Sequence, residues 1–150
     1  MNIAGKIPPE INNSLNLFFS NIVKLFPEVF LNAYITGSLV SGDFYPNKSD
    51  IDLIIIAKEN FDKKQLSQLA SFHKQFARKF GRPYINGFYF TPENLKRTFR
   101  TAPAYFDGKS FVESFPLNLL ETNLFELKHN SIPLFENEKM EYVHSKNKLT

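Results

Sequence analysis

Two aspartates near the middle of the chain have the residue type and spacing of a metal site. Asp50 and Asp52 lead into the apolar run 53–57, which predicts a strand from Asp50 to Ala57 with both faces buried. Residues two apart in a strand share a face, so both carboxylates should project to the same side. Two negative charges so close together repel and need a cation between them. Mg²⁺ fits best, because phosphates would supply its further ligands.

A second candidate feature, Gly37-Ser38, ends the preceding predicted strand, which runs from Leu31 to Thr36. Glycine allows a close approach of the backbone, and serine offers a hydroxyl and an N–H group, which together suit a phosphate. Each pair alone is common at turns and strand ends. A phosphate-binding pair joined by a short polar loop to a metal-binding pair is more specific, and it predicts a triphosphate site.

The elements that must position these residues alternate between helix and strand. Apolar periodicity, caps and turn residues predict helices from Pro8 to Pro27, Leu39 to Asp43, Phe61 to Phe80, Thr91 onward and Leu117 to His129. The same signals predict strands over 31–36, 50–57, 84–90 and 132–135, with 101–110 irregular. This order indicates an α/β (α+β) fold, a small mixed sheet flanked by helices. Residues 1–135 are expected to form one domain, and 136–150 a polar tail without fixed structure.

Composition narrows the class of protein. The chain of 150 residues has no Cys, which excludes a disulfide scaffold and a zinc–thiolate site. Its longest apolar run is too short to span a bilayer, so we expect no membrane and a cytoplasmic location. Seven basic residues and one acidic residue lie between 74 and 100. They indicate either a positive wall for phosphate or a solvated helix face, and nucleic acid is an unlikely partner.

Two side chains in this basic region carry separate expectations. His73 lies between Phe72 and Lys74 in the predicted helix, and a surface or half-buried position is expected rather than a site role. Arg82, together with Lys79, precedes the third strand and is a candidate to contact a phosphate.

The chain resembles the polymerase-β-like nucleotidyltransferase superfamily in residues 36–43 (TGSLVSGD) and 49–53 (SDIDL). Within that superfamily it is most similar to the N-terminal catalytic domain of aminoglycoside (streptomycin/spectinomycin) adenylyltransferases. Residues 86–95 and 125–134 agree more weakly, so the resemblance covers about 10–136. It implies a nucleotidyltransferase fold.

The resemblance also implies an activity and a set of roles. A nucleoside monophosphate, AMP from ATP, would pass with Mg²⁺ to a hydroxyl of a small molecule such as an aminoglycoside, an antibiotic-resistance reaction. Gly37 and Ser38 would hold the β- and γ-phosphates, and Asp50 and Asp52 would ligate the metal. Ser49 and Lys48, just before the aspartates, are further candidates for nucleotide contact.

Asn86 stands where the family has a third carboxylate on its third strand. An amide has no negative charge and no useful basicity, and losing a general base typically costs ~10²- to 10⁴-fold. Three explanations stay open: poor or absent transfer, replacement of the base by substrate or water, or a shifted alignment. The enzymes that the chain resembles carry a helical C-terminal domain after the catalytic one, whereas this sequence stops at Thr150, which leaves a fragment and a natural minimal protein as open alternatives. The alternatives are a non-catalytic nucleotide-binding module, or an antitoxin-type minimal nucleotidyltransferase acting on a protein partner.

Overall fold

The computed structural model describes residues 7–95, 104–107, 111–112 and 117–139. Helices and strands follow one another in the predicted α/β order, with two additional short strands, β4 and β5. The elements are α1 (Pro9–Leu25), β1 (Phe30–Thr36), α2 (Ser38–Ser41), β2 (Ile51–Ala57), α3 (Lys63–Phe80), β3 (Ile85–Phe90), α4 (Pro92–Leu95), β4 (Ala104–Phe106), β5 (Phe111–Val112), α5 (Leu117–His129) and β6 (Ile132–Glu136).

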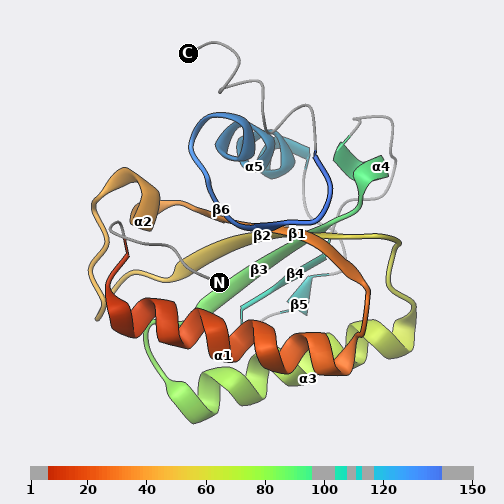
Figure 1. The fold of residues 1–150 in the computed structure, drawn as a ribbon, viewed down its shortest axis with the longest axis horizontal. Coiled ribbons are helices and arrows are strands. Elements are labelled where there is room, and N and C mark those ends of the chain that lie inside the picture. Colours follow the sequence, from red (N-terminus) through yellow and green to blue (C-terminus); the bar gives the residue numbers. More distant parts are fainter. Residues whose placement is uncertain (1–6, 96–103, 108–110, 113–116, 140–150) are drawn as a thin grey trace.

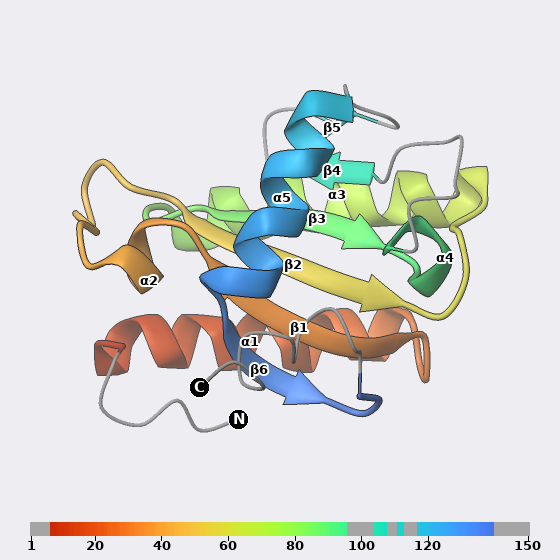
Figure 2. The same cartoon turned by 90° about the horizontal axis from the view of Figure 1, so that it is seen from above.

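The strands form one mixed sheet in the order β5-β4-β3-β2-β1-β6. The pair β2–β3 is parallel, and α3 is the crossover that a parallel pair requires. The other described pairs are antiparallel. Helices α1 and α3 cover one face of the sheet, and α5 crosses the other face (Figures 1 and 2). The predicted small mixed sheet flanked by helices is therefore confirmed.

Strand β2 lies at the centre of this arrangement and is buried on both faces, as its continuous apolar run predicts. Leu53 and Ile55 belong to the core beneath α1 and α3. Ile54 and Ile56 belong to a second core that includes Leu127 of α5. Because side chains alternate along a strand, Asp52 shares the α5 face of the sheet with Ile54.

Helix α3 is well delimited and carries an unexpected buried residue. It begins with a capping box between Asp62 and Gln65 and ends at Gly81, the predicted C-cap, where φ is +68°. The prediction of a surface or half-buried His73 is wrong, because this side chain is 3% exposed and packs in the core. Its Nε2 lies 2.7 Å from the Tyr89 hydroxyl, and burial lowers the pKa of His73 from 6.5 to about 3.

The missing side chain of Gly87 makes room for this histidine. A Cβ at Gly87 would lie 3.2 Å from His73 Nε2 and 2.8 Å from Tyr89 Cε2. Helix α3 can therefore place its imidazole directly against the sheet.

Two segments are more ordered than predicted. The region expected to be irregular contains β4, which is stabilised by pairing with β3 rather than by its own three-residue sequence. At the end of the described chain, Glu136 still belongs to β6. The next two residues are held by Asn32, whose Oδ1 accepts from the Asn137 N–H at 2.8 Å and the Glu138 N–H at 3.1 Å. The rest of the predicted tail, 140–150, lies outside the described residues.

Candidate functional site

The predicted phosphate and metal residues meet at one end of the sheet. Asp52 is the cross-strand partner of Thr36, and Gly37 follows Thr36 directly, at the start of α2. Asp50 immediately precedes β2. The antiparallel β1–β2 pair thus brings together two segments that the polar loop separates in sequence.

Gly37 and Asp52 approach each other so closely that only glycine fits. Gly37 has φ +76°, and a Cβ built on it would lie 2.6 Å from Asp52 Oδ2. The glycine has a backbone that other residues rarely adopt, and it leaves space that the carboxylate fills. The Gly-Ser segment and the aspartates are therefore one structural unit.

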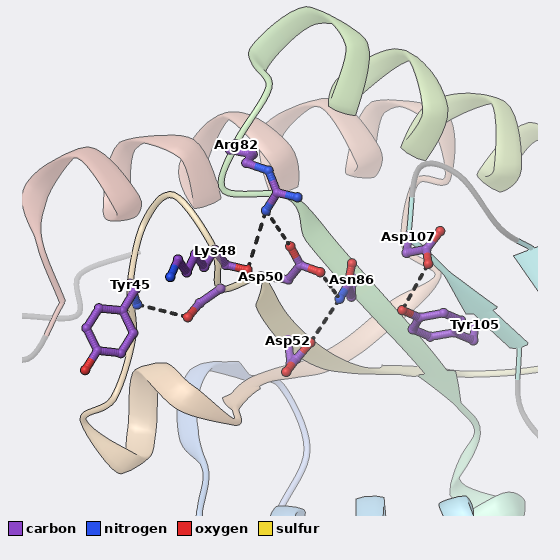
Figure 3. Close-up of polar contacts among 9 residues, drawn as sticks. Tyr45, Lys48, Asp50, Asp52, Arg82, Asn86, Tyr105 and Asp107 are labelled. Carbon is purple, nitrogen blue, oxygen red and sulfur yellow. Dashed lines mark hydrogen bonds and ion pairs between the residues drawn. The ribbon is translucent and has the colours of Figure 1, made fainter.

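Asn86 joins both carboxylates. The parallel register pairs it with Asp52, and its Nδ2 donates to Asp50 Oδ2 at 3.2 Å and to Asp52 Oδ1 at 3.1 Å. Figure 3 shows the amide nitrogen directed at both aspartates. The side chain is buried, and its Oδ1 has no hydrogen-bond partner. Asn86 therefore lies beside the aspartates, at the position where the resemblance expects a carboxylate.

The environment makes Asp52 hard to ionise. Burial raises its pKa to about 6, the hydrogen bond from Asn86 lowers it, and the negative charges of Asp50 and Glu126 raise it. A raised carboxylate pKa beside a second carboxylate is the electrostatic pattern that a bound cation would relieve.

Arg82 forms an ion pair with one of these aspartates. Its Nη1 lies 3.8 Å from Asp50 Oδ1 and donates to the Lys48 carbonyl oxygen at 3.5 Å. The guanidinium also packs over the Tyr84 ring, 4.8 Å from its centroid. Arg82 thus lies at the rim of the site, between the polar loop and Asp50 (Figure 3).

The other predicted nucleotide residues, Lys48 and Ser49, lie in the loop before β2. The Lys48 side chain is exposed. The Ser49 hydroxyl accepts from the Tyr45 N–H at 2.9 Å, so in this structure it closes the loop upon itself. Whether either residue contacts a nucleotide stays a prediction.

Three side chains near the site were not among the predicted site residues. The Tyr105 hydroxyl donates to Asp107 Oδ2 at 3.3 Å, and burial, Asp107, and the charges of Asp52 and Asp50 all raise the pKa of Tyr105. Tyr105 also packs on Phe88, with ring centroids 4.5 Å apart. Glu126 of α5 acts on Asp52 through its charge. The sequence offered little signal for them, because β4 is the three-residue segment Ala-Tyr-Phe, too short to show a strand period.

The residues present are compatible with a divalent metal ion. Hard cations take carboxylate and amide oxygens, and the site offers two carboxylates and the partnerless Oδ1 of Asn86. Within the described part of the chain, no group of three or more His, Cys, Asp or Glu side chains could hold a metal. Phosphate oxygens and water would supply the remaining ligands of a Mg²⁺ ion held by two carboxylates.

The structure describes only part of the basic region between residues 74 and 100. Lys74, Arg78 and Lys79 are exposed on α3, which agrees with a solvated helix face. Lys96, Arg97 and Arg100 lie outside the described residues. None of the helices in the described ranges is both long enough and apolar enough to cross a membrane.

Comparison with known proteins identifies the fold. The crystal structure of spectinomycin adenyltransferase AAD(9) from Enterococcus faecialis with ATP and spectinomycin aligns with a TM-score of 0.68 at 15% identity, covering 88% of this chain. This chain spans 58% of the length of that protein. A nucleotidyltransferase structure from Sulfolobus solfataricus matches at 18% identity over 73% of this chain and 97% of that one, but its TM-score of 0.35 carries no argument.

The sequence comparisons agree with this structural likeness at the level of the family. No curated protein sequence matches the chain significantly. Residues 19–102, which contain both the Gly-Ser pair and the aspartates, match the nucleotidyltransferase domain model. The chain belongs to the nucleotidyltransferase domain family.

Proposed function

We propose that the chain transfers a nucleoside monophosphate, AMP from ATP, to a hydroxyl group of a small molecule of the aminoglycoside kind, with Mg²⁺ bound at Asp50 and Asp52. The family and the fold support a nucleotide substrate. The structural relative contains ATP and spectinomycin, which supports a small polyhydroxylated acceptor.

One observation carries the proposal: the predicted phosphate segment and the predicted metal ligands touch. The Asp52 carboxylate fills the space that a side chain at position 37 would need. Phosphates held by Gly37 and Ser38 would therefore lie beside the cation held by the aspartates. Bound there, Mg²⁺ would stabilise negative charge on the α-phosphate and the leaving pyrophosphate. Arg82, at the rim beside Asp50, is placed to meet a further phosphate oxygen.

The transfer also requires a group that accepts the proton of the attacking hydroxyl. A bond forms between that oxygen and the α-phosphorus, the bond to the β-phosphate oxygen breaks, and pyrophosphate leaves. Asn86 has no basicity, and we assign the proton to Asp107 instead. This carboxylate directly follows β4, the strand next to β3, and the Tyr105 hydroxyl fixes its orientation.

Calorimetry with ATP, with and without Mg²⁺, tests the nucleotide site. The double variant Asp50→Ala, Asp52→Ala should lose Mg-ATP binding. Asp43→Ala should retain it, because within the described part of the chain this exposed carboxylate hydrogen-bonds only to the Ser41 hydroxyl. Labelled ATP, Mg²⁺ and a panel of aminoglycosides then test transfer. Equal Mg-ATP affinity in the double variant and the wild type would show that the site is misplaced.

A second candidate is a nucleotide-binding module that performs no transfer. Asn86 favours it, because an amide stands where the resemblance expects a carboxylate. Mg-ATP binding without transfer to any acceptor, in the wild type and in Asn86→Asp alike, would support this candidate over the enzyme.

A further inference from the structure

The position of Asn86 leads beyond the proposed function, on whose metal site it rests. Its single side-chain nitrogen lies between two carboxylates and donates to both, at 3.2 Å to Asp50 and 3.1 Å to Asp52. Each hydrogen of the NH₂ group can serve one carboxylate. A group that bridges two ligand oxygens in this way occupies the place where a cation would be expected.

The orientation of this amide follows from charge. An amide carries partial positive charge on NH₂ and partial negative charge on its oxygen, so between two carboxylates the nitrogen must face them. The opposite end shows the cost of this arrangement. Asn86 Oδ1 is buried without a hydrogen-bond partner, and an unpaired buried acceptor is unfavourable. These hydrogen bonds therefore hold the three side chains together, but one acceptor is left unused.

A cation reverses this preference. With Mg²⁺ between the aspartates, NH₂ would be repelled, and a half-turn about the bond between Cβ and Cγ would present Oδ1 instead. An amide oxygen is an ordinary ligand of hard cations. The unused acceptor of the metal-free site thereby acquires a role.

We propose that Asn86 is a built-in substitute for the metal ion, whose NH₂ group bridges Asp50 and Asp52 until a cation displaces it and Oδ1 turns to face that cation. Because the ion must displace two hydrogen bonds and gains a neutral ligand rather than a third carboxylate, free Mg²⁺ binds weakly. Mg²⁺ is then retained only together with a triphosphate, which supplies the missing negative oxygens.

The side-chain amide signals of ¹⁵N-asparagine-labelled protein report the turn directly. On titration with MgCl₂ plus ATP, the Asn86 NH₂ protons should move upfield as they leave the carboxylates. Asn94 is the matched internal reference, because its buried side chain caps α4, where Oδ1 accepts from the Thr91 N–H at 2.9 Å. An Asn86 signal that stays fixed in protein saturated with Mg-ATP would overturn the turning of the amide.

Substitutions test the bridging role with no metal present. In EDTA, the Asn86→Leu variant should unfold at a lower temperature than the wild type. It should have little effect in a background with Asp50→Asn and Asp52→Asn, where no charges need bridging. Equal loss in both backgrounds would mean that Asn86 acts only by packing, and the inference would fail.

Magnesium affinity separates this inference from the proposed function. Calorimetry with MgCl₂ alone should show about tenfold tighter binding by Asn86→Asp than by the wild type, because a third carboxylate replaces the amide. If the wild type binds Mg-ATP and the Asn86 amide turns, but no acceptor is modified, the proposed function fails and the inference stands. If neither protein binds Mg²⁺ or Mg-ATP, both fail. If both bind it equally, the inference alone fails.

Discussion

Replacing Gly37 by alanine should damage the site far more than it damages the fold. Its backbone angles, φ 76° and ψ −146°, lie near a region that is almost exclusive to glycine, so an alanine there costs about 1–3 kcal/mol of stability. The new Cβ would also lie 2.6 Å from Asp52 Oδ2, where ordinary contact begins near 3.4 Å. The carboxylate must therefore move by about 0.8 Å, taken from those two distances.

Gly81 provides a matched control for the stability cost of placing alanine at these backbone angles. Its angles, φ 68° and ψ −150°, are nearly the same, yet a Cβ there would have no atom within 4 Å. Both alanine variants should therefore lose similar free energy of unfolding, about 1–3 kcal/mol each in urea titrations. Only Gly37→Ala should also displace a metal ligand.

Calorimetry with Mg-ATP then measures how the displaced Asp52 carboxylate affects Mg-ATP affinity. Misorienting a metal ligand typically lowers metal affinity by about 10- to 100-fold, and we expect a loss of that size for Gly37→Ala. Gly81→Ala should bind Mg-ATP as the wild type does. If the two variants bind Mg-ATP equally well, the close contact between Gly37 and Asp52 does not shape the site, and the reasoning is refuted.

Three further predictions concern polar groups outside the metal pair. In His73→Gln, which can keep a polar contact with Tyr89, the stability loss relative to the wild type should shrink by about 2 kcal/mol between pH 6 and pH 4.5, because only the histidine must stay neutral. Asn32→Ala should lower the free energy of unfolding by about 3 kcal/mol. Asn137→Ala should lower it by less, because among the described residues the Asn137 side chain makes a single hydrogen bond, to the Phe30 carbonyl at 3.4 Å. Asp107→Asn should slow transfer to an active acceptor by about 10²-fold at unchanged Mg-ATP affinity.

The sign of the His73 prediction follows from its lowered pKa. Burial brings it from 6.5 to about 3, so between these values the unfolded chain binds a proton that the folded chain refuses. Stability is therefore lost as the pH falls from 6.5 toward 3. Asp52, whose pKa is raised to about 6, contributes in the opposite direction, and comparing variant with wild type at each pH cancels that contribution.

Each of these predictions has an outcome that contradicts it. A His73→Gln stability difference that is independent of pH would mean that the histidine can be protonated in the fold. Equal unfolding curves for the Asn32 and Asn137 alanine variants would mean that Asn32 does not attach the segment after β6. An unchanged transfer rate in Asp107→Asn would remove that residue as the proton acceptor.

Local patterns predicted the parts of the fold and site that depend on local physics. Alternation along β2 placed Asp50 and Asp52 on one side, and helix periodicity predicted α1 and α3. The same periodicity could have located His73, which follows Leu69 by four residues and precedes Phe76 by three on the buried stripe of α3. The charge of the adjacent Lys74 favoured a surface position for His73, and this signal was weaker than the helix periodicity.

Contacts between distant segments could not be predicted from such patterns. Strand β4 is three residues long, and its pairing with β3 depends on a register that no local pattern specifies. Asp107 approaches the site only through that register. Asn32 accepts hydrogen bonds from backbone groups about a hundred residues later, and the residues next to it in the sequence give no sign of these contacts. The contact between Gly37 and Asp52 likewise appears only when β1 and β2 are paired.

The packing of His73 over Gly87 has a consequence for how this sequence can drift. A Cβ at position 87 would clash with the Tyr89 ring at 2.8 Å and crowd the imidazole at 3.1 Å, so the residues at positions 87 and 73 are not free to vary independently. A relative that carries alanine or serine at the equivalent of Gly87 should carry a smaller residue at the equivalent of His73, or a helix shifted away from the sheet. The pair is thus an evolutionary unit, in which the first change must be compensated by the second.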